Sequence, residues 1–290
     1  MRLIHLTDPH LSNLDGLKLS ALWGKRWSGY VSWRKNRQKK YLPGVLEKLC
    51  AAVKAENADQ ILLTGDLVQI GLESEIGQAA EWLADLGSAD RVMLVPGNHD
   101  VYARGSAAVV CDSWAEYLFH GGQPGHFPVL RKLGKLSLIG LSTACASPLF
   151  MATGKLDTGQ LKELARLLET AAAEQQLTCL LIHHPPLPRM TKWRKALANA
   201  QALQDVLERF VPPLIFHGHL HHNREQQWGS SRIFCTAAAS SVSDASYRVI
   251  DIEDAGECWS LHMALKSIAV ESAGGVEFPA VDEQNWLVPK

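Results

Sequence analysis

The feature that most constrains this chain is an alternation of short apolar runs with longer stretches of helical periodicity. The apolar runs lie near residues 2–6, 60–63, 91–95, 135–141, 177–182 and 213–216. The candidate helices between them are 43–57, 73–86, 158–174 and 193–210. Short buried strands that alternate with helices predict an α/β fold with a largely parallel sheet.

The carboxyl-terminal part has a different pattern. The segments RIFCTAAA, YRVIDIED and CWSLHMAL follow one another with short connections, which predicts consecutive antiparallel strands in a mixed or second sheet. From about residue 273 we expect an irregular, docked tail. Because no linker-like segment divides the chain, we predict a single domain over residues 1–290.

The composition excludes several classes of protein. Apolar residues make up 47% of the chain and charged residues 20%, which is typical of a globular enzyme and not of a disordered chain. The net charge of -1 gives no overall attraction to nucleic acid or membrane. The six cysteines are scattered without a CxxC pair, as reduced thiols would be. With no leader or membrane-spanning stretch in the sequence, we expect a cytoplasmic protein, with peripheral association at the inner face of the membrane as the alternative.

Side chains that bind metals follow five of the predicted strands, at the point where each apolar run ends. They are Asp8, His10, Asp66, Asn98, His99, Asp100, His183, His184, His219 and His221. Ligands of open α/β sheets bind at the carboxyl ends of the strands, so we expect these side chains to share one edge. A single Asp or His after a strand is commonly a turn former or a helix cap, but repetition at equivalent places indicates a site.

The spacing and type of these residues favour a pair of metal ions. Residues two apart on an extended segment face the same way, so Asp8 with His10 and His219 with His221 can each present two ligands. Mixed carboxylate and imidazole donors suit Mn, Fe, Zn or Co. There are too many donors for one ion. Two ions about 3.5–4 Å apart with a shared carboxylate would use them all and would suit phosphoester hydrolysis.

In order along the chain, the motifs DxH, GD, GNHD, a strand ending in HH, and GHxH resemble those of the calcineurin-like metallophosphoesterase family. They extend from Asp8 to His221. The resemblance implies a four-layer α/β/β/α sandwich, in which two mixed sheets are flanked by helices and a binuclear metal site lies at the sheet edge. It also implies that a metal-bridging hydroxide attacks the phosphorus in line.

The resemblance further assigns roles to individual residues. The implied ligands are Asp8, His10 and His221 for one ion and Asn98, His183 and His219 for the other, with Asp66 as the bridge. His99 would face the substrate phosphate and stabilise the transition state or protonate the leaving oxygen. His183 is chosen over His184 because the family places its ligand first after the strand. We expect Asp100 to cap a turn or to accept a hydrogen bond from a metal-binding His.

Departures from the family's pattern narrow the substrate. Asp66 is followed by LVQIG and not by the DRG segment of serine/threonine protein phosphatases, and the chain has little room for the capping domain of related exonucleases. The pattern is most similar to bacterial cyclic-nucleotide phosphodiesterases, so we predict a phosphodiesterase acting on a cyclic nucleotide or a related small diester. One alternative is a peripheral membrane hydrolase of a lipid-linked phosphoester or pyrophosphate. A more distant one is a non-catalytic scaffold with the same fold.

A basic, Trp-rich insertion at about residues 18–41 separates the first strand from the first predicted helix. Its eight basic residues are Lys18, Lys25, Arg26, Arg34, Lys35, Arg37, Lys39 and Lys40, and it contains no acidic residue. If it is helical, Trp23, Trp27 and Tyr30 share one face, and with Trp33 they resemble a helix on an anionic membrane surface. Alternatively, the aromatic rings pack on the core while the charged groups stay in water, or they stack on the bases of a nucleotide or single strand. The overall charge makes a nucleic-acid partner the less favoured interpretation, and the sequence does not specify an oligomeric state.

Overall fold

The computed structural model describes residues 1–11, 14, 17, 19–119, 125–270 and 275–290. Its first large sheet has the strand order β14-β11-β10-β1-β2-β3. The strands are β1 (Arg2–Leu6), β2 (Gln60–Leu63), β3 (Val92–Leu94), β10 (Ser246–Asp254), β11 (Cys258–Ser267) and β14 (Ala280–Pro289). β1, β2 and β3 are parallel, whereas β10, β11 and β14 run antiparallel to their neighbours. The predicted antiparallel pairing of residues 247–254 with residues 258–265 is confirmed.

The second large sheet has the order β4-β5-β6-β7-β9-β8. Its strands are β4 (Val129–Leu133), β5 (Leu136–Gly140), β6 (Leu177–Leu181), β7 (Leu214–His217), β8 (Arg224–Trp228) and β9 (Ser231–Cys235). The run RIFCTAAA forms β9, which pairs parallel to β7 and not antiparallel to β10, so our expectation for this segment was wrong. We did not predict β8, because it is polar and has no apolar alternation. β8 pairs antiparallel with β9 through a turn at Gly229, and this hairpin places β9 in the second sheet.

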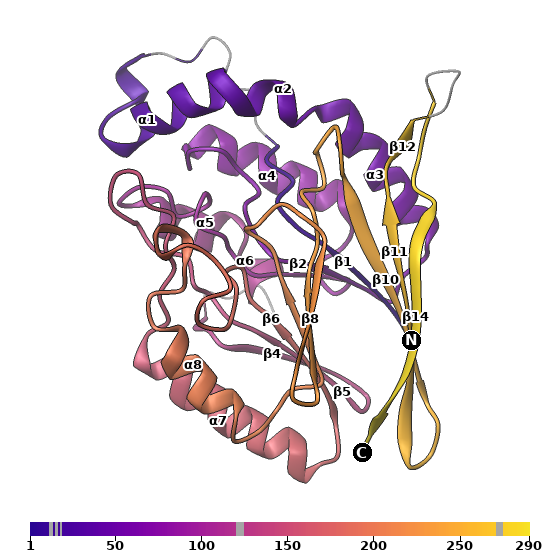
Figure 1. Ribbon diagram of the computed structural model, residues 1–290. Helices are drawn as coiled ribbons and strands as arrows, with labels where there is room; N and C mark the ends of the chain where they lie inside the picture. Colours follow the sequence, from indigo (N-terminus) through magenta and orange to yellow (C-terminus); the bar gives the residue numbers. More distant parts are fainter. Residues whose placement is uncertain (12–13, 15–16, 18, 120–124, 271–274) are drawn as a thin grey trace.

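Helices cover the outer face of each sheet, as Figure 1 shows. The first sheet packs against α3 (Pro43–Ala55), α4 (Glu73–Leu86), α5 (Ser106–Ser113) and α6 (Ala115–Leu118). The second sheet packs against α7 (Thr158–Ala173) and α8 (Ala200–Leu207). A third apolar core fills the space between the two sheets. The predicted α/β/β/α sandwich of two mixed sheets is confirmed.

The alternation along β1 explains how one short strand serves two cores. Ile4 and Leu6 point to the helical side of the first sheet, and Leu3 points to the second sheet, where it packs in the same core as Phe216. All four side chains are fully buried. Burial of each contributes about 1.5–3 kcal/mol, so β1 is held firmly and the polar residues that follow it start from a fixed position.

Two sequence expectations about regular structure were wrong. The helix expected over 193–210 is only η3 (Trp193–Lys195) followed by α8, because the residues between them pair with another loop: the Ala198 amide donates to the Gly154 carbonyl at 2.8 Å. The expected irregular tail is β14, which pairs along the whole of β11 and packs Trp286 against the core between the sheets. It is a largely exposed edge strand whose first half is polar, with four consecutive polar residues at 282–285, so the sequence shows no regular apolar alternation there. Residue 273 itself lies outside the described part.

The basic insertion folds as a series of short helices over one end of the first sheet. They are η1 (Leu19–Ala21), α1 (Lys25–Ser32), the π-helical segment η2 (Trp33–Arg37) and α2 (Gln38–Lys40). Lys18 lies outside the described residues. A small two-stranded sheet of β12 (Ala269–Val270) and β13 (Val276–Glu277) lies beside α3. Among the described residues, we find no helix that is both long and apolar enough to cross a membrane.

Candidate metal centre

The carboxyl ends of four strands, β1, β2, β6 and β7, bring predicted ligands into two neighbouring groups. The first group is Asp8, His10, Asp66 and His221, and the second is Asp66, His183 and His219. Within each group the candidate ligand atoms all lie within 4.8 Å of one another. Asp66 belongs to both groups, which is the position that a bridging carboxylate requires. Every member is buried except His221, which is partly exposed.

The first group surrounds one oxygen of Asp8. His221 Nε2 lies 3.0 Å from Asp8 Oδ1, and His10 Nε2 lies 3.9 Å from the same oxygen. The two imidazole nitrogens are 3.3 Å apart. Three donor atoms from two separate strand ends therefore face a common point.

The second group surrounds one oxygen of Asp66. His183 Nε2 lies 3.3 Å from Asp66 Oδ2 and 3.3 Å from the amide oxygen of Asn98. The ring of His219 packs 5.1 Å from that of His183, measured between centroids. His99 approaches from the other side, with its Nε2 4.0 Å from Asp66 Oδ2.

In both Asp8 and Asp66, one carboxylate oxygen accepts hydrogen bonds from neighbouring residues and the other faces the candidate centre. Asp8 Oδ2 accepts hydrogen bonds from the His219 amide at 2.9 Å and from the Thr7 hydroxyl at 2.8 Å. Asp66 Oδ1 accepts one from the His99 amide at 2.7 Å. The other oxygens, Asp8 Oδ1 and Asp66 Oδ2, and also His219 Nε2, are buried without a hydrogen-bond partner among the described residues. Since buried polar atoms are costly to leave unpaired, these atoms fit the role of metal ligands.

The histidine rings are oriented by bonds on their far sides. His183 Nδ1 donates to the Thr64 carbonyl at 2.7 Å, and His10 Nδ1 donates to the Val68 carbonyl at 3.2 Å. His221 Nδ1 is hydrogen-bonded to the Tyr41 hydroxyl. A hydrogen bond on Nδ1 directs Nε2 toward the centre, as is usual for metal-binding histidines.

The backbone is strained where the ligands lie. Asp8, His10, Asp66, His219 and His221 all have positive φ, between 46° and 70°. Non-glycine residues rarely adopt this region, and each costs on the order of 1–3 kcal/mol. This clustering at the carboxyl ends of the strands marks a functional site, because only the surrounding hydrogen bonds and packing hold the strain in place.

Two glycines allow the ligand loops to approach one another. A Cβ at Gly97 would lie 2.2 Å from Asp66 Oδ1, and a Cβ at Gly218 would lie 2.5 Å from Asp8 Oδ2. Any side chain at either position would displace a carboxylate of the centre. The glycines in the GNHD and GHxH motifs are therefore required because there is no room for a side chain at these positions.

The charges in the cluster differ from one residue to the next. Burial opposes ionisation of Asp8, but His221 outweighs it and lowers the pKa of Asp8 to about 2. Burial lowers the pKa of His10 to about 3 and that of His219 well below its usual value. Burial also opposes the charge on His183, but the Asp66 and Asp8 carboxylates raise its pKa to about 9. Without metal, His183 holds a proton that a metal ion would replace.

The motif residues His184 and Asp100 make their hydrogen bonds away from the two ligand groups' shared point. His184 Nδ1 is 2.7 Å from the Thr143 hydroxyl, and its Nε2 donates to the Ala152 carbonyl, so both of its nitrogens are used away from the centre. Asp100 accepts hydrogen bonds from four backbone amides, those of Asp66, Leu67, Val68 and Gly97. We had expected Asp100 to cap the following turn or to accept a hydrogen bond from a histidine. In the structure it does neither. It ties the Asp66 loop to the Gly97 loop.

A hollow of about 980 Å³ opens beside Asn98 and His99. The insertion forms one side of it, and Arg37 places Nη1 3.2 Å from His99 Nδ1. Residues 150–152 and 192–195 form the other side. The sequence did not indicate that these two loops contribute to a site, and it identified Arg37 only as one of the basic residues of the insertion. A short basic and aromatic run at 192–195 was the one available signal.

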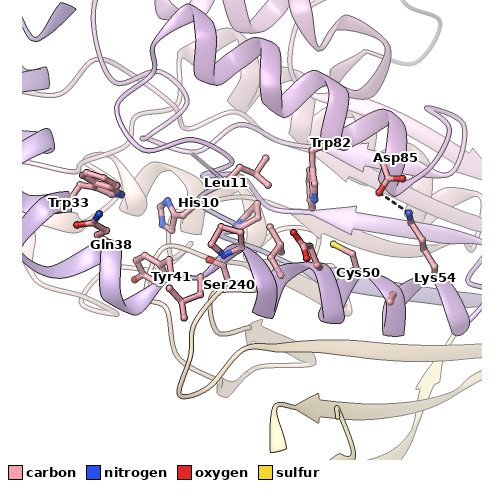
Figure 2. A pocket seen from close by; sticks show the side chains of 16 residues that line it. His10, Leu11, Trp33, Gln38, Tyr41, Cys50, Lys54, Trp82, Asp85 and Ser240 are labelled. Atoms are coloured by element: carbon pink, nitrogen blue, oxygen red, sulfur yellow. Dashed lines mark hydrogen bonds and ion pairs between the residues drawn. The ribbon is translucent and has the colours of Figure 1, made fainter. Parts of the chain in front are cut away.

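A second hollow lies on the other side of the insertion and is mainly apolar. It has a volume of about 500 Å³ and is lined along one side by α3. In Figure 2, Trp33, His10 and Tyr41 lie toward one end of it, and Trp82 and the Lys54–Asp85 ion pair lie toward the other. Of the predicted ligands it contacts only His10. The hollow beside His99 adjoins the second group, because Asn98 and His99 line it and lie next to His183 and Asp66.

Comparison with known sequences assigns the chain to a family. Residues 1–223, which include both ligand groups, match the calcineurin-like phosphoesterase family. The chain belongs to this family. It is a metal-dependent phosphoester hydrolase, and the resemblance seen in its motifs is confirmed.

Individual relatives agree with this assignment. The chain is 28% identical to the 3',5'-cyclic adenosine monophosphate phosphodiesterase CpdA of Escherichia coli K12, covering 81% of this chain and 75% of the relative. It is 26% identical to a probable cyclic nucleotide phosphodiesterase of Vesicomyosocius okutanii, covering 69% of this chain and 81% of the relative. The crystal structure of a dimetal phosphatase from Danio rerio shares the fold, with a TM-score of 0.64, 14% identity and 98% coverage of each chain.

Proposed function

We propose that this chain is a binuclear metal-dependent phosphodiesterase that acts on a cyclic nucleotide or a related small phosphodiester. The observation that carries the proposal is the pair of ligand groups that share Asp66 and contain three buried ligand atoms without hydrogen-bond partners. The similarity to two cyclic nucleotide phosphodiesterases supports the choice of substrate.

In this proposal the ligands divide as the two groups do. Asp8, His10 and His221 would hold one ion, Asn98, His183 and His219 would hold the other, and Asp66 would be shared by both. Two bound divalent ions supply positive charge for the phosphoryl oxygens and lower the pKa of water enough for attack near neutral pH. The oxygen and nitrogen donors suit Mn, Fe, Zn or Co, with no preference built into the donor set.

His99 is the residue placed to act on the substrate. Its Nδ1 donates to the Gln69 carbonyl, which turns Nε2 toward Asp66 and the mouth of the hollow. From there Nε2 can donate a hydrogen bond to a phosphoryl oxygen or give a proton to the leaving oxygen. Arg37, 3.2 Å from the same ring, adds a fixed positive charge where the anionic phosphate enters.

The test is hydrolysis of a chromogenic phosphodiester beside its monoester. Metal-free protein is reconstituted with manganese and assayed first with this pair and then with a panel of cyclic nucleotides and nucleotide-linked lipids. Metal-dependent cleavage of the diester and of cyclic nucleotides is the expected result. Cleavage confined to nucleotide-linked lipids would replace this substrate with a lipid-linked phosphoester or pyrophosphate, and no metal-dependent turnover on any substrate would indicate a scaffold.

A further inference from the structure

Large apolar side chains are exposed around the mouth of the hollow beside His99. Trp27 of α1 is 52% exposed, Phe150 is 75% exposed and Trp193 is 68% exposed, and all three line the hollow. Leu149 and Trp23 are also exposed and adjoin these segments in sequence. The three lining residues come from segments far apart in the chain and converge at one opening. We call Trp27, Phe150 and Trp193 the aromatic rim.

Cations are interleaved with the aromatic rim. The basic residues that line the same hollow are Lys25, Arg37, Lys192, Arg194 and Lys195. No carboxylate lines it within the described ranges, and none of these five cations forms an ion pair with a carboxylate there. Because the whole chain is nearly neutral, this opening is a local positive field.

The rim differs from the surface that the sequence suggested. Trp33 is only 3% exposed and lines the apolar groove in Figure 2, and Tyr30 stacks on it with ring centroids 5.9 Å apart. Trp23 precedes the helix, which begins at Lys25. The insertion therefore turns Tyr30 and Trp33 inward and leaves Trp27 outward, while Phe150 and Trp193 join it from the opposite loops.

We propose that the aromatic rim docks on an anionic lipid surface and holds the mouth of the hollow against it. Tryptophan is favoured at the boundary between headgroups and acyl chains, and neighbouring Lys and Arg are attracted to anionic lipids. Docking itself does not depend on the proposed hydrolysis. Only its consequence, that the centre meets phosphoesters presented at that surface, rests on the proposed function.

The chemistry of the rim favours a bilayer over a nucleic acid. Phe150 and Leu149 adjoin in sequence and expose purely apolar surface to water, which a hydrocarbon boundary covers and a phosphate backbone does not. Leu149 has no aromatic face on which a base could stack. The positive charge is spread around an opening and not along a groove of the length that a single strand follows.

The test is flotation of the full chain with lipid vesicles. We expect it to float with phosphatidylcholine vesicles that contain phosphatidylglycerol, and to remain unbound with phosphatidylcholine alone. Replacing Phe150 and Trp193 together by Ser should weaken binding by at least about tenfold. Replacing Lys192 by Glu should weaken it by about fivefold or more, and added salt should weaken it further.

A matched control comes from β14, an edge strand of the first sheet. Val281 and Leu287 of β14 are 57% and 64% exposed, and neither lines the hollow, so their replacement by Ser should leave flotation unchanged. The proposal is overturned if the native chain does not float with anionic vesicles, or if the Phe150 and Trp193 variant floats as well as the control. Stronger binding to a single-stranded oligonucleotide than to vesicles would also overturn it. Hydrolysis of a soluble diester without vesicles tests the catalytic proposal separately.

Discussion

The metal centre and the aromatic rim lie beside the same hollow but are built in opposite ways. In the centre, ionised carboxylates and imidazoles are buried, compensate one another and are fixed by hydrogen bonds to strained backbone. Around the rim, the aromatic rings and the neighbouring Lys192, Arg194 and Lys195 are exposed to solvent, and these cations have no carboxylate partners among the described residues. The difference separates two tasks: the centre must be rigid and specific in geometry, whereas the rim needs only charge and apolar surface.

The largest effect should come from the carboxylate shared by both ligand groups. Asp66→Asn removes the bridging charge and should lower turnover by about a thousandfold or more while the chain stays folded. Asn98→Ala, which removes one donor of the second group, should also abolish measurable turnover. Bound metal per chain and the rate of diester hydrolysis are the measurements.

A surface carboxylate provides the matched control for this prediction. Asp85 pairs with Lys54 at 2.9 Å and is largely exposed, so Asp85→Asn should change neither rate nor metal content. If Asp66→Asn hydrolysed the diester at the native rate, the two ligand groups would not act as one centre. The comparison of a rigid metal centre with the aromatic rim would then be wrong.

A smaller loss is expected from crowding the centre. Gly97→Ala places a Cβ 2.2 Å from Asp66 Oδ1, so we expect a loss of about 1–3 kcal/mol in unfolding free energy and a fall in activity of about a hundredfold. Denaturant unfolding and diester hydrolysis measure the two effects. Gly77, in α4 with open space around it, is the control: Gly77→Ala should raise stability by about 0.5–1 kcal/mol. If Gly97→Ala and Gly77→Ala changed the unfolding free energy and the rate of diester hydrolysis equally, the centre would be less rigid than its contacts indicate.

The pH dependence of metal binding should follow His183. Its pKa in the metal-free protein is raised to about 9, so binding displaces a proton, and metal affinity should fall by roughly tenfold per pH unit below that value. Protonated His183 also stabilises the metal-free fold. That contribution is complete below the pKa of about 6.5 in the unfolded chain and disappears as the pH rises through 9. Manganese titrations between pH 6 and 9, roughly the interval between those two pKa values, would contradict the assignment if affinity stayed constant.

The smallest predicted effect is a change in product affinity with pH, caused by Lys25 in the hollow. Burial lowers the pKa of Lys25 to about 8, where its ammonium group donates to the Ser147 hydroxyl and lies over the Tyr102 ring. Above pH 8 it loses its charge, so affinity for an anionic product such as a nucleoside monophosphate should fall by about fivefold. Lys25→Arg should remove this pH dependence, since Arg stays charged. A product affinity that fell equally in both proteins would assign the effect to another group.

The ligands were predictable because each follows a recognisable strand end. The sequence places Asp8, Asp66, Asn98 and His219 directly after buried apolar runs, and parallel strands deliver such residues to one edge whatever the details of packing. The sandwich followed from the resemblance that these motifs carry. Local spacing therefore predicted which residues gather at the sheet edge, whereas their individual roles and the sandwich were implied by the resemblance.

Tertiary structure decided whatever depends on contacts between distant segments. Asp100 anchors two loops because its carboxylate reaches four amides, His184 leaves the centre because Thr143 and Ala152 hold it, and β14 exists because β11 offers a free edge. Trp33 turned inward and Phe150 outward for the same reason. A side chain's burial is set by what other parts of the chain cover it, and no local pattern contains that information. The sequence by itself predicted the candidate metal ligands, and the tertiary structure decided which surfaces surround them.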